Sequence, residues 1–118
     1  MERFFKDDFT NNVSTLALTA SVNYPAIDMG MLKTISIMLI FTNATLVGNW
    51  QLQVSNYSGD ISQIPAASWI NLGSAVAVAG TQQLIENTAV SGRFARLQFL
   101  FTSGSGAITT FDVIAKDI

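Results

Sequence analysis

Hydrophobic and polar residues alternate along most of this chain, with the two-residue period that is typical of β-strands. In residues 34–41 (TISIMLIF) four apolar residues share one face of a strand: Ile35, Ile37, Leu39 and Phe41. Residues 93–101 and 107–117 repeat this pattern, with Leu97, Phe99 and Phe101 on one face of the first and Phe111, Val113 and Ala115 on one face of the second. We therefore predict a strand in each segment, with one face in the core.

Residues 47–60 (VGNWQLQVSNYSGD) predict a further strand followed by a turn. Trp50, Leu52 and Val54 fall on one face, and Gln51, Gln53 and Ser55 fall on the other. Asn56, Ser58 and Asp60 then alternate like the ligands of a calcium loop, but the carboxylates that such a loop needs are missing. The pattern favours a turn closed by Asx and Ser hydrogen bonds. Weaker patterns predict strands within 13–22, 69–80 and 82–87.

Turn residues separate these segments at the spacing expected of an all-β protein. The clearest turn is SGSG at 103–106, which predicts a hairpin between the strands of 93–101 and 107–117. Seven or eight antiparallel strands in 118 residues predict one all-β domain over residues 1–118, a two-sheet β-sandwich of jelly-roll or Greek-key type. A small closed barrel is the alternative.

Composition limits the classes of function. Only 12% of residues are charged and the net charge is −2, so we expect no nucleic acid as a partner. The longest run that is mainly apolar, residues 34–41, has eight residues, and residues 1–9 lack a secretory signal pattern, so we expect neither a membrane span nor export. With 49% hydrophobic residues, much of the surface must be neutral and partly apolar. Such a surface is typical of a protein that another protein covers.

The residue types also argue against catalysis. The chain has no histidine and no cysteine, which are the usual bases, nucleophiles and soft-metal ligands near neutral pH. Single carboxylates are scattered through turns and strand ends, at Asp28, Asp60, Glu86, Asp112 and Asp117. We therefore predict that the protein is not an enzyme and has no catalytic residues, no metal and no cofactor.

Five apolar residues fall on strand faces that a monomer would give to water: Met38, Ile40, Leu100, Ile108 and Ile114. A patch of this kind predicts an interface in a homo-oligomer, either a trimer or a dimer. The alternative is that these strands are central and covered on both faces, because buried strands have continuous apolar runs.

Residues 1–9 form a separate candidate interface. Phe4, Phe5 and Phe9 alternate with charged residues, which suits an arm that docks on a neighbouring subunit. An edge strand of the same sandwich is the equal alternative.

The residues of 33–118 also resemble a known group of proteins. GNWQLQVSNYSGD, a later Trp69 and GRFARLQFLFTSGSGAITTFDVIAKD resemble small jelly-roll-like β-sandwich structural proteins of bacteriophage virions. The resemblance implies a capsid decoration or cement protein, made in the host cytoplasm, that binds the major capsid protein or another virion protein at the capsid surface. A tail fibre, baseplate or adaptor subunit is the alternative within virions, and a carbohydrate-binding module is the alternative from another class.

Overall fold

The computed structural model describes residues 2–4 and 16–117. These residues form nine strands joined in one antiparallel sheet, with two short 3-10 helices between β5 and β6. The strands are β1 (Glu2–Phe4), β2 (Leu16–Ala17), β3 (Val22–Asn23), β4 (Ile27–Asp28), β5 (Thr34–Ser55), β6 (Ile70–Asn71), β7 (Val76–Ala77), β8 (Gln82–Asn87) and β9 (Phe94–Lys116). The helices are η1 (Ile61–Gln63) and η2 (Ala66–Ser68). The prediction of an all-β antiparallel fold is confirmed.

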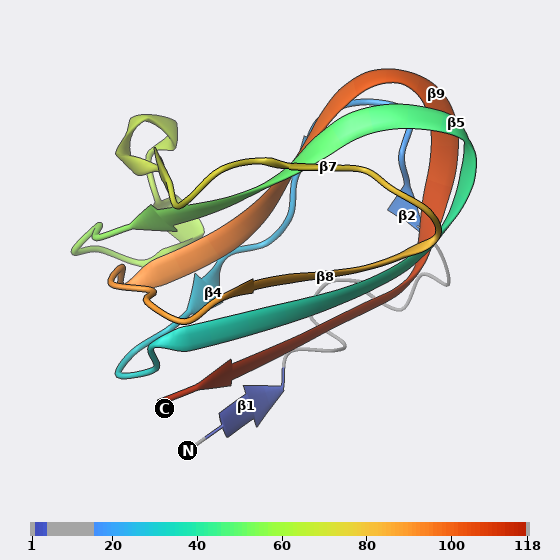
Figure 1. Ribbon diagram of the computed structural model, residues 1–118. Helices are drawn as coiled ribbons and strands as arrows, with labels where there is room; N and C mark the ends of the chain where they lie inside the picture. The colour runs from blue at the N-terminus through green and yellow to red at the C-terminus, as the bar shows by residue number, and fades with distance from the viewer. Residues whose placement is uncertain (1, 5–15, 118) are drawn as a thin grey trace.

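Two long strands form the frame of the molecule. β5 has 22 residues and β9 has 23, and they pair from Thr34 opposite Lys116 to Ser55 opposite Phe94. Figure 1 shows both strands arching over together, so that the sheet folds back on itself into two layers. The layers are therefore two halves of one hydrogen-bonded sheet.

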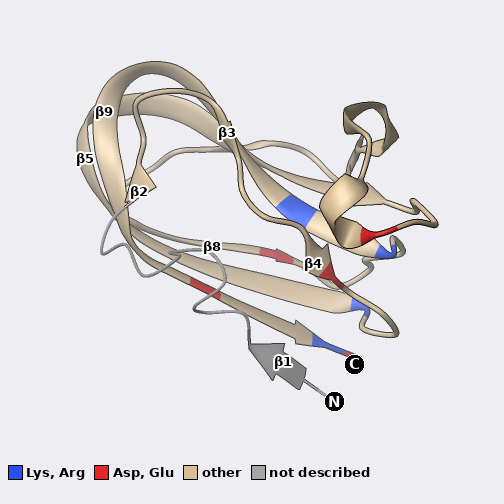
Figure 2. Ribbon diagram, turned by 180° about the vertical axis from the view of Figure 1, so that it is seen from behind, with Lys and Arg blue, Asp and Glu red and all other residues tan. Residues whose placement is uncertain are grey.

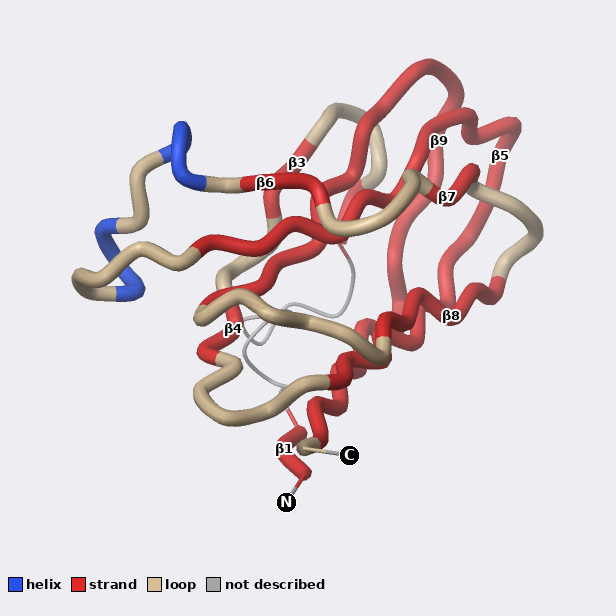
Figure 3. The backbone as a smooth tube through the Cα atoms, turned by 60° about the vertical axis from the view of Figure 1, so that its left-hand side comes forward, coloured by secondary structure: helices blue, strands red, loops and turns tan. Residues whose placement is uncertain are grey.

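Each layer is completed by shorter strands on both sides. In the first, which we call the β8 layer, the first half of β5 lies between β8 and the second half of β9, and β1 pairs with β9. In the second, the β7 layer, the second half of β5 lies between β6 and β7 on one side and the first half of β9 on the other. β3 and β4 pair with the far edge of this half of β9 (Figure 3), and β2 pairs with β9 close to the bend (Figure 1).

The predicted hairpin at 103–106 is wrong, because SGSG continues β9 through the bend. The register shifts near Phe41 and again on both sides of Val47, and these irregularities allow the paired strands to curve. Gly104 has φ +84°, and a Cβ at this residue would lie 2.1 Å from the carbonyl oxygen of Thr45. The glycines therefore allow close contact between two bent strands, where the sequence pattern indicated a chain reversal.

The core lies between the two layers and is rich in aromatic side chains. Trp50 is fully buried, with its ring centroid 5.7 Å from that of Phe41 and 4.9 Å from that of Phe99. Its indole Nε1 donates a 2.8 Å hydrogen bond to Oε1 of Gln83 on β8, which ties the two layers together. Tyr24 makes an edge-to-face contact with Phe111 at 4.9 Å. The predicted inward faces of 34–41 and 111–115 are confirmed by their burial, and of the predicted face of Trp50, Leu52 and Val54 the first two are buried and Val54 is half-buried.

Candidate functional site

The outer face of the β8 layer is the main candidate surface. Three residues each of β8, β5 and β9 lie on this face, because they alternate with core residues such as Ile85 of β8, Ile37 of β5 and Val113 of β9. The register sets them in three rows: Gln82–Ile40–Thr110, Leu84–Met38–Asp112 and Glu86–Ser36–Ile114. Leu84 and Met38 are 55% and 40% exposed, so the middle row presents apolar side chains directly to solvent.

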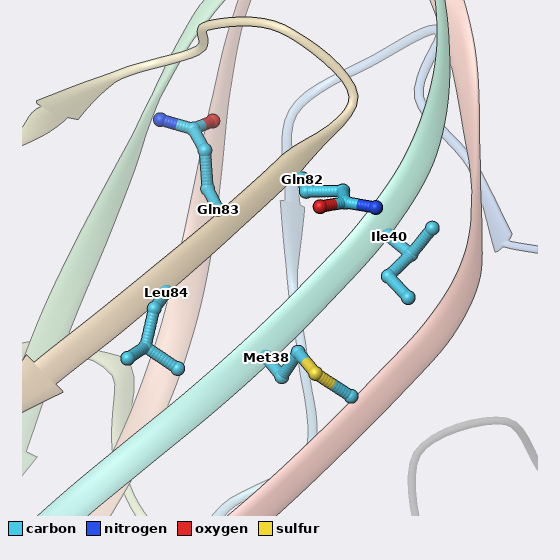
Figure 4. Close-up of a pocket in the computed structure, with 5 residues that line it drawn as sticks. All are labelled: Met38, Ile40, Gln82, Gln83 and Leu84. Carbon is cyan, nitrogen blue, oxygen red and sulfur yellow. The ribbon is translucent and has the colours of Figure 1, made fainter.

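A shallow groove of about 410 Å³ lies over this face. Met38 and Ile40 of β5 line it together with Gln82, Gln83 and Leu84 of β8 (Figure 4). Its walls are mainly hydrocarbon, and the Gln82 amide lies over toward Ile40 (Figure 4). A surface of this composition is suited to burying an apolar contact from another protein.

Three of the five predicted strand interface residues belong to this face. Met38, Ile40 and Ile114 lie on its adjacent strands β5 and β9. Leu100 is also exposed, at 37%, but it belongs to the β7 layer, where it pairs with Asn49. The five residues therefore do not form one patch.

The prediction for Ile108 is wrong, because this side chain is 1% exposed and belongs to the core. Ile40 pairs with Thr110 and Phe41 pairs with Ile108, which leaves Thr109 as an extra residue in β9. The bulge shifts the alternation of buried and exposed side chains by one residue. From Phe111 onward the buried residues of β9 have odd numbers, whereas the buried Ile108 has an even number. Without the bulge, strict alternation would place Ile108 on the outer face.

The N-terminal candidates are only partly described. Phe4 is the last residue of β1 and pairs in register with Ile114, so residues 2–4 form an edge strand of the sheet. Phe5 and Phe9 lie outside the described residues.

Leu84 is the exposed apolar residue of this face that the sequence reasoning missed. In QQLIEN it alternates with the buried Ile85, which is the signal that places it outward. A single apolar residue in a short polar segment is too weak a pattern to mark an interface residue by itself.

The outer face of the β7 layer holds a polar cluster. Gln51, Gln53 and Ser55 do lie opposite Trp50 and Leu52, but all three are buried beneath the chain segment that leaves β5 and returns as β6. Gln51 donates through Nε2 to the carbonyl oxygens of Leu52, Leu72 and Gly73. Ser55 Oγ lies 2.9 Å from Ser68 Oγ. These bonds hold the connecting segment against the sheet.

Arg96 completes this cluster. Its Nε donates a 2.8 Å hydrogen bond to Oε1 of Gln53, whose Nε2 donates to Asn71. The guanidinium lies over the Trp69 ring, 4.3 Å from the centroid, and partial burial lowers the pKa of Arg96. The amide groups of Gln51 and Gln53 are used inside the protein, so the cluster positions the segment of residues 56–72.

The charged residues in the described part of the chain are few and lie away from the bend (Figure 2). Asp60 caps η1 by accepting hydrogen bonds from N and Oγ of Ser62, both at 2.8 Å, and these bonds lower the pKa of its carboxyl group. The Asx hydrogen bond of Asp60 therefore lies at the end of the predicted turn at 56–60, and Asn56 at its start accepts a 2.9 Å hydrogen bond from Arg93 N. Among residues 2–4 and 16–117, no three carboxylate side chains gather as metal ligands. The same residues contain no helix long and apolar enough to span a membrane.

Comparison of the chain with protein-family models and with curated protein sequences gave no match in either case.

Proposed function

We propose that this chain is a non-enzymatic structural protein of a virion, a capsid decoration or cement protein that binds the outside of a phage head and stabilises contacts between capsid subunits. The observation that supports it best is the exposed apolar pair of Met38 and Leu84 on the outer face of the β8 layer, beside Ile40. Burial of such a pair against another protein is favourable, provided that the two carboxylates of this face, Glu86 and Asp112, are paired by the partner or stay solvated at the edge of the contact.

The fold fits the same proposal. Two packed layers of antiparallel strands support assignment to the jelly-roll type of β-sandwich that the sequence resemblance implies. The partners are the major capsid protein or another virion protein, together with further copies of this chain. The capsid surface is then the location of the mature protein.

Immunogold electron microscopy tests the location. An antibody raised against the purified chain should label the heads of virus particles grown from the source of the sequence. Label on tails or fibres would instead favour a fibre, baseplate or adaptor subunit, and unlabelled particles would contradict the proposal. Saturable binding on a glycan array would favour the carbohydrate-binding alternative.

A matched pair of variants tests the surface. Met38→Lys places a charge on the proposed contact face, whereas Met31→Lys makes the same change at a loop residue that is 88% exposed. Particles stripped of the protein should rebind wild type and Met31→Lys, but not Met38→Lys. Equal rebinding of both variants would show that this face does not contact the particle.

A further inference from the structure

Among the strands that the structure describes, β8 has one edge without a partner, which we call the free edge. It pairs with β5 along all six of its residues, and no strand of the described chain pairs with its other side. Natural proteins usually protect such an edge with proline, lysine, a bulge or a very short strand. β8 (QQLIEN) has no proline and no lysine, and its register with β5 is regular. Glu86 is its one charged residue, and an edge of this length with no other protection is suited to pairing with another strand.

The hydrogen-bond pattern fixes which main-chain groups face that edge. Phe41 N donates to Thr81 O at 2.9 Å, so Thr81 and every second residue after it direct their amide and carbonyl groups toward β5. Gln82, Leu84 and Glu86 therefore direct both groups toward the free edge. These are also the three residues whose side chains occupy the outer face of the β8 layer.

We propose that two copies of this chain form a dimer by antiparallel pairing of β8 with β8, on a twofold axis at Leu84. This register pairs Leu84 with Leu84 of the second copy, and it pairs Gln82 with Glu86 on each side of the axis. Every outward amide and carbonyl of the three residues then has a partner. The proposal rests on the self-association included in the proposed function, and it names the contact.

Side-chain chemistry selects this register. Gln82 is an amide donor, and it lies opposite the Glu86 carboxylate in both halves of the dimer. An axis at Glu86 would instead place two carboxylates opposite each other, which is unfavourable, and an axis at Gln82 would leave Glu86 beyond the end of the paired strand. The Leu84 pair also lies next to Met38 of each copy, so the apolar row continues across the axis.

Charge variants at the edge test the register in solution. Gln82→Glu places like charges in two symmetry-related pairs, which should raise the dimer dissociation constant roughly 2- to 30-fold. Gln82→Glu combined with Glu86→Lys pairs opposite charges and should restore wild-type association. Inside one chain these residues pair with the neutral Ile40 and Ser36, so the exchange leaves intrachain charge pairs unchanged. Gln63→Glu, an exposed change in η1, is the matched control.

Light scattering measures the mass of the protein in solution, and sedimentation measures the dissociation constant of the dimer. Wild type should have twice the chain mass of 12.7 kDa. A monomer at every concentration up to roughly 1 mM would overturn the proposal. A dimer whose dissociation constant is the same for Gln82→Glu and Gln63→Glu would also overturn it, because the contact would then lie elsewhere.

A crosslink provides a second readout that does not depend on affinity. The chain has no cysteine, so Leu84→Cys introduces a single thiol at the axis. Directly opposite Cα atoms in a hydrogen-bonded pair lie about 5.5 Å apart, which a disulfide can span. Leu84→Cys should form a covalent dimer much faster than Ala67→Cys in the exposed helix η2, and equal rates would count against the contact. Unlabelled virus particles with an intact dimer would refute the proposed function alone, and head labelling with a monomeric protein would refute the dimer alone.

Discussion

Substitution of Gly104 by alanine tests whether the bend depends on the close approach of β5 and β9. Gly104 has φ +84°, which costs an L-residue roughly 1–2 kcal/mol. The added Cβ would lie 2.1 Å from Thr45 O, more than 1 Å closer than ordinary contact. The strands must separate at this point, with the loss of about two backbone hydrogen bonds at about 1 kcal/mol each. A smaller gain, about 0.5 kcal/mol, comes from the stiffer unfolded chain.

The expected loss of unfolding free energy is therefore about 3 kcal/mol, out of roughly 5–15 kcal/mol for a typical domain. Gly80→Ala is the matched control, because Gly80 has φ +61° and no atom within 4 Å of an added Cβ. It has only the conformational cost, about 1 kcal/mol. At roughly 4 °C per kcal/mol, Tm should fall by about 12 °C for Gly104→Ala and by about 4 °C for the control.

Urea denaturation followed by tryptophan fluorescence measures both variants, because Trp50 is fully buried between the layers. Equal losses for the two alanine variants would refute the argument that steric contact at the bend limits the residue choice at Gly104.

Three further outcomes follow from burial and hydrogen bonding. Ile108→Ala should lower the unfolding free energy by about 2–5 kcal/mol and Met38→Ala by less than about 1 kcal/mol, and similar losses in urea denaturation would contradict the assignment of Ile108 to the core. The carboxyl group of Asp60 should titrate below its usual pKa, and Ser62→Ala should raise that pKa. Because the folded-state pKa is depressed, the cap stabilises the protein above the unfolded-state pKa, and this contribution is lost as the pH falls through the folded-state pKa. An unshifted pKa of Asp60 measured by NMR would exclude the cap. Gln53→Ala should cost about 1–3 kcal/mol because it leaves two polar partners unpaired, and a neutral effect on Tm would show that water replaces them.

The alternation of residues predicted the strand faces well where the backbone is regular. Ile35, Ile37 and Leu39 are all buried, as their period of two requires. Where the backbone has a bulge the prediction fails, as at Ile108. A bulge depends on how two strands fit around a bend, and that fit is a property of the pair of strands.

The SGSG segment shows a second limit of local patterns. Glycine and serine are common in hairpin turns because glycine adopts positive φ at little cost, and the same freedom allows two strands to bend together without reversing. Gly104 uses positive φ within β9, opposite the β5 bend at Thr45, where φ is also positive at 58°. A hairpin turn and a bend within one strand differ here only in the partner strand, which lies about sixty residues away in the sequence.

The polar residues of β5 show why the exposure of a side chain is harder to predict than the sheet face on which it lies. Gln51 and Gln53 lie on the face that alternation gives them, yet both are buried, because the segment of residues 56–72 covers that face. Burial is tolerated because each amide has hydrogen-bond partners on that segment or on β9. On the opposite layer Met38 and Leu84 lie on the outer face, and there no segment of the described chain covers them. The two outer faces thus differ: the segment of residues 56–72 encloses the polar one, whereas no described segment covers the apolar row of Met38 and Leu84.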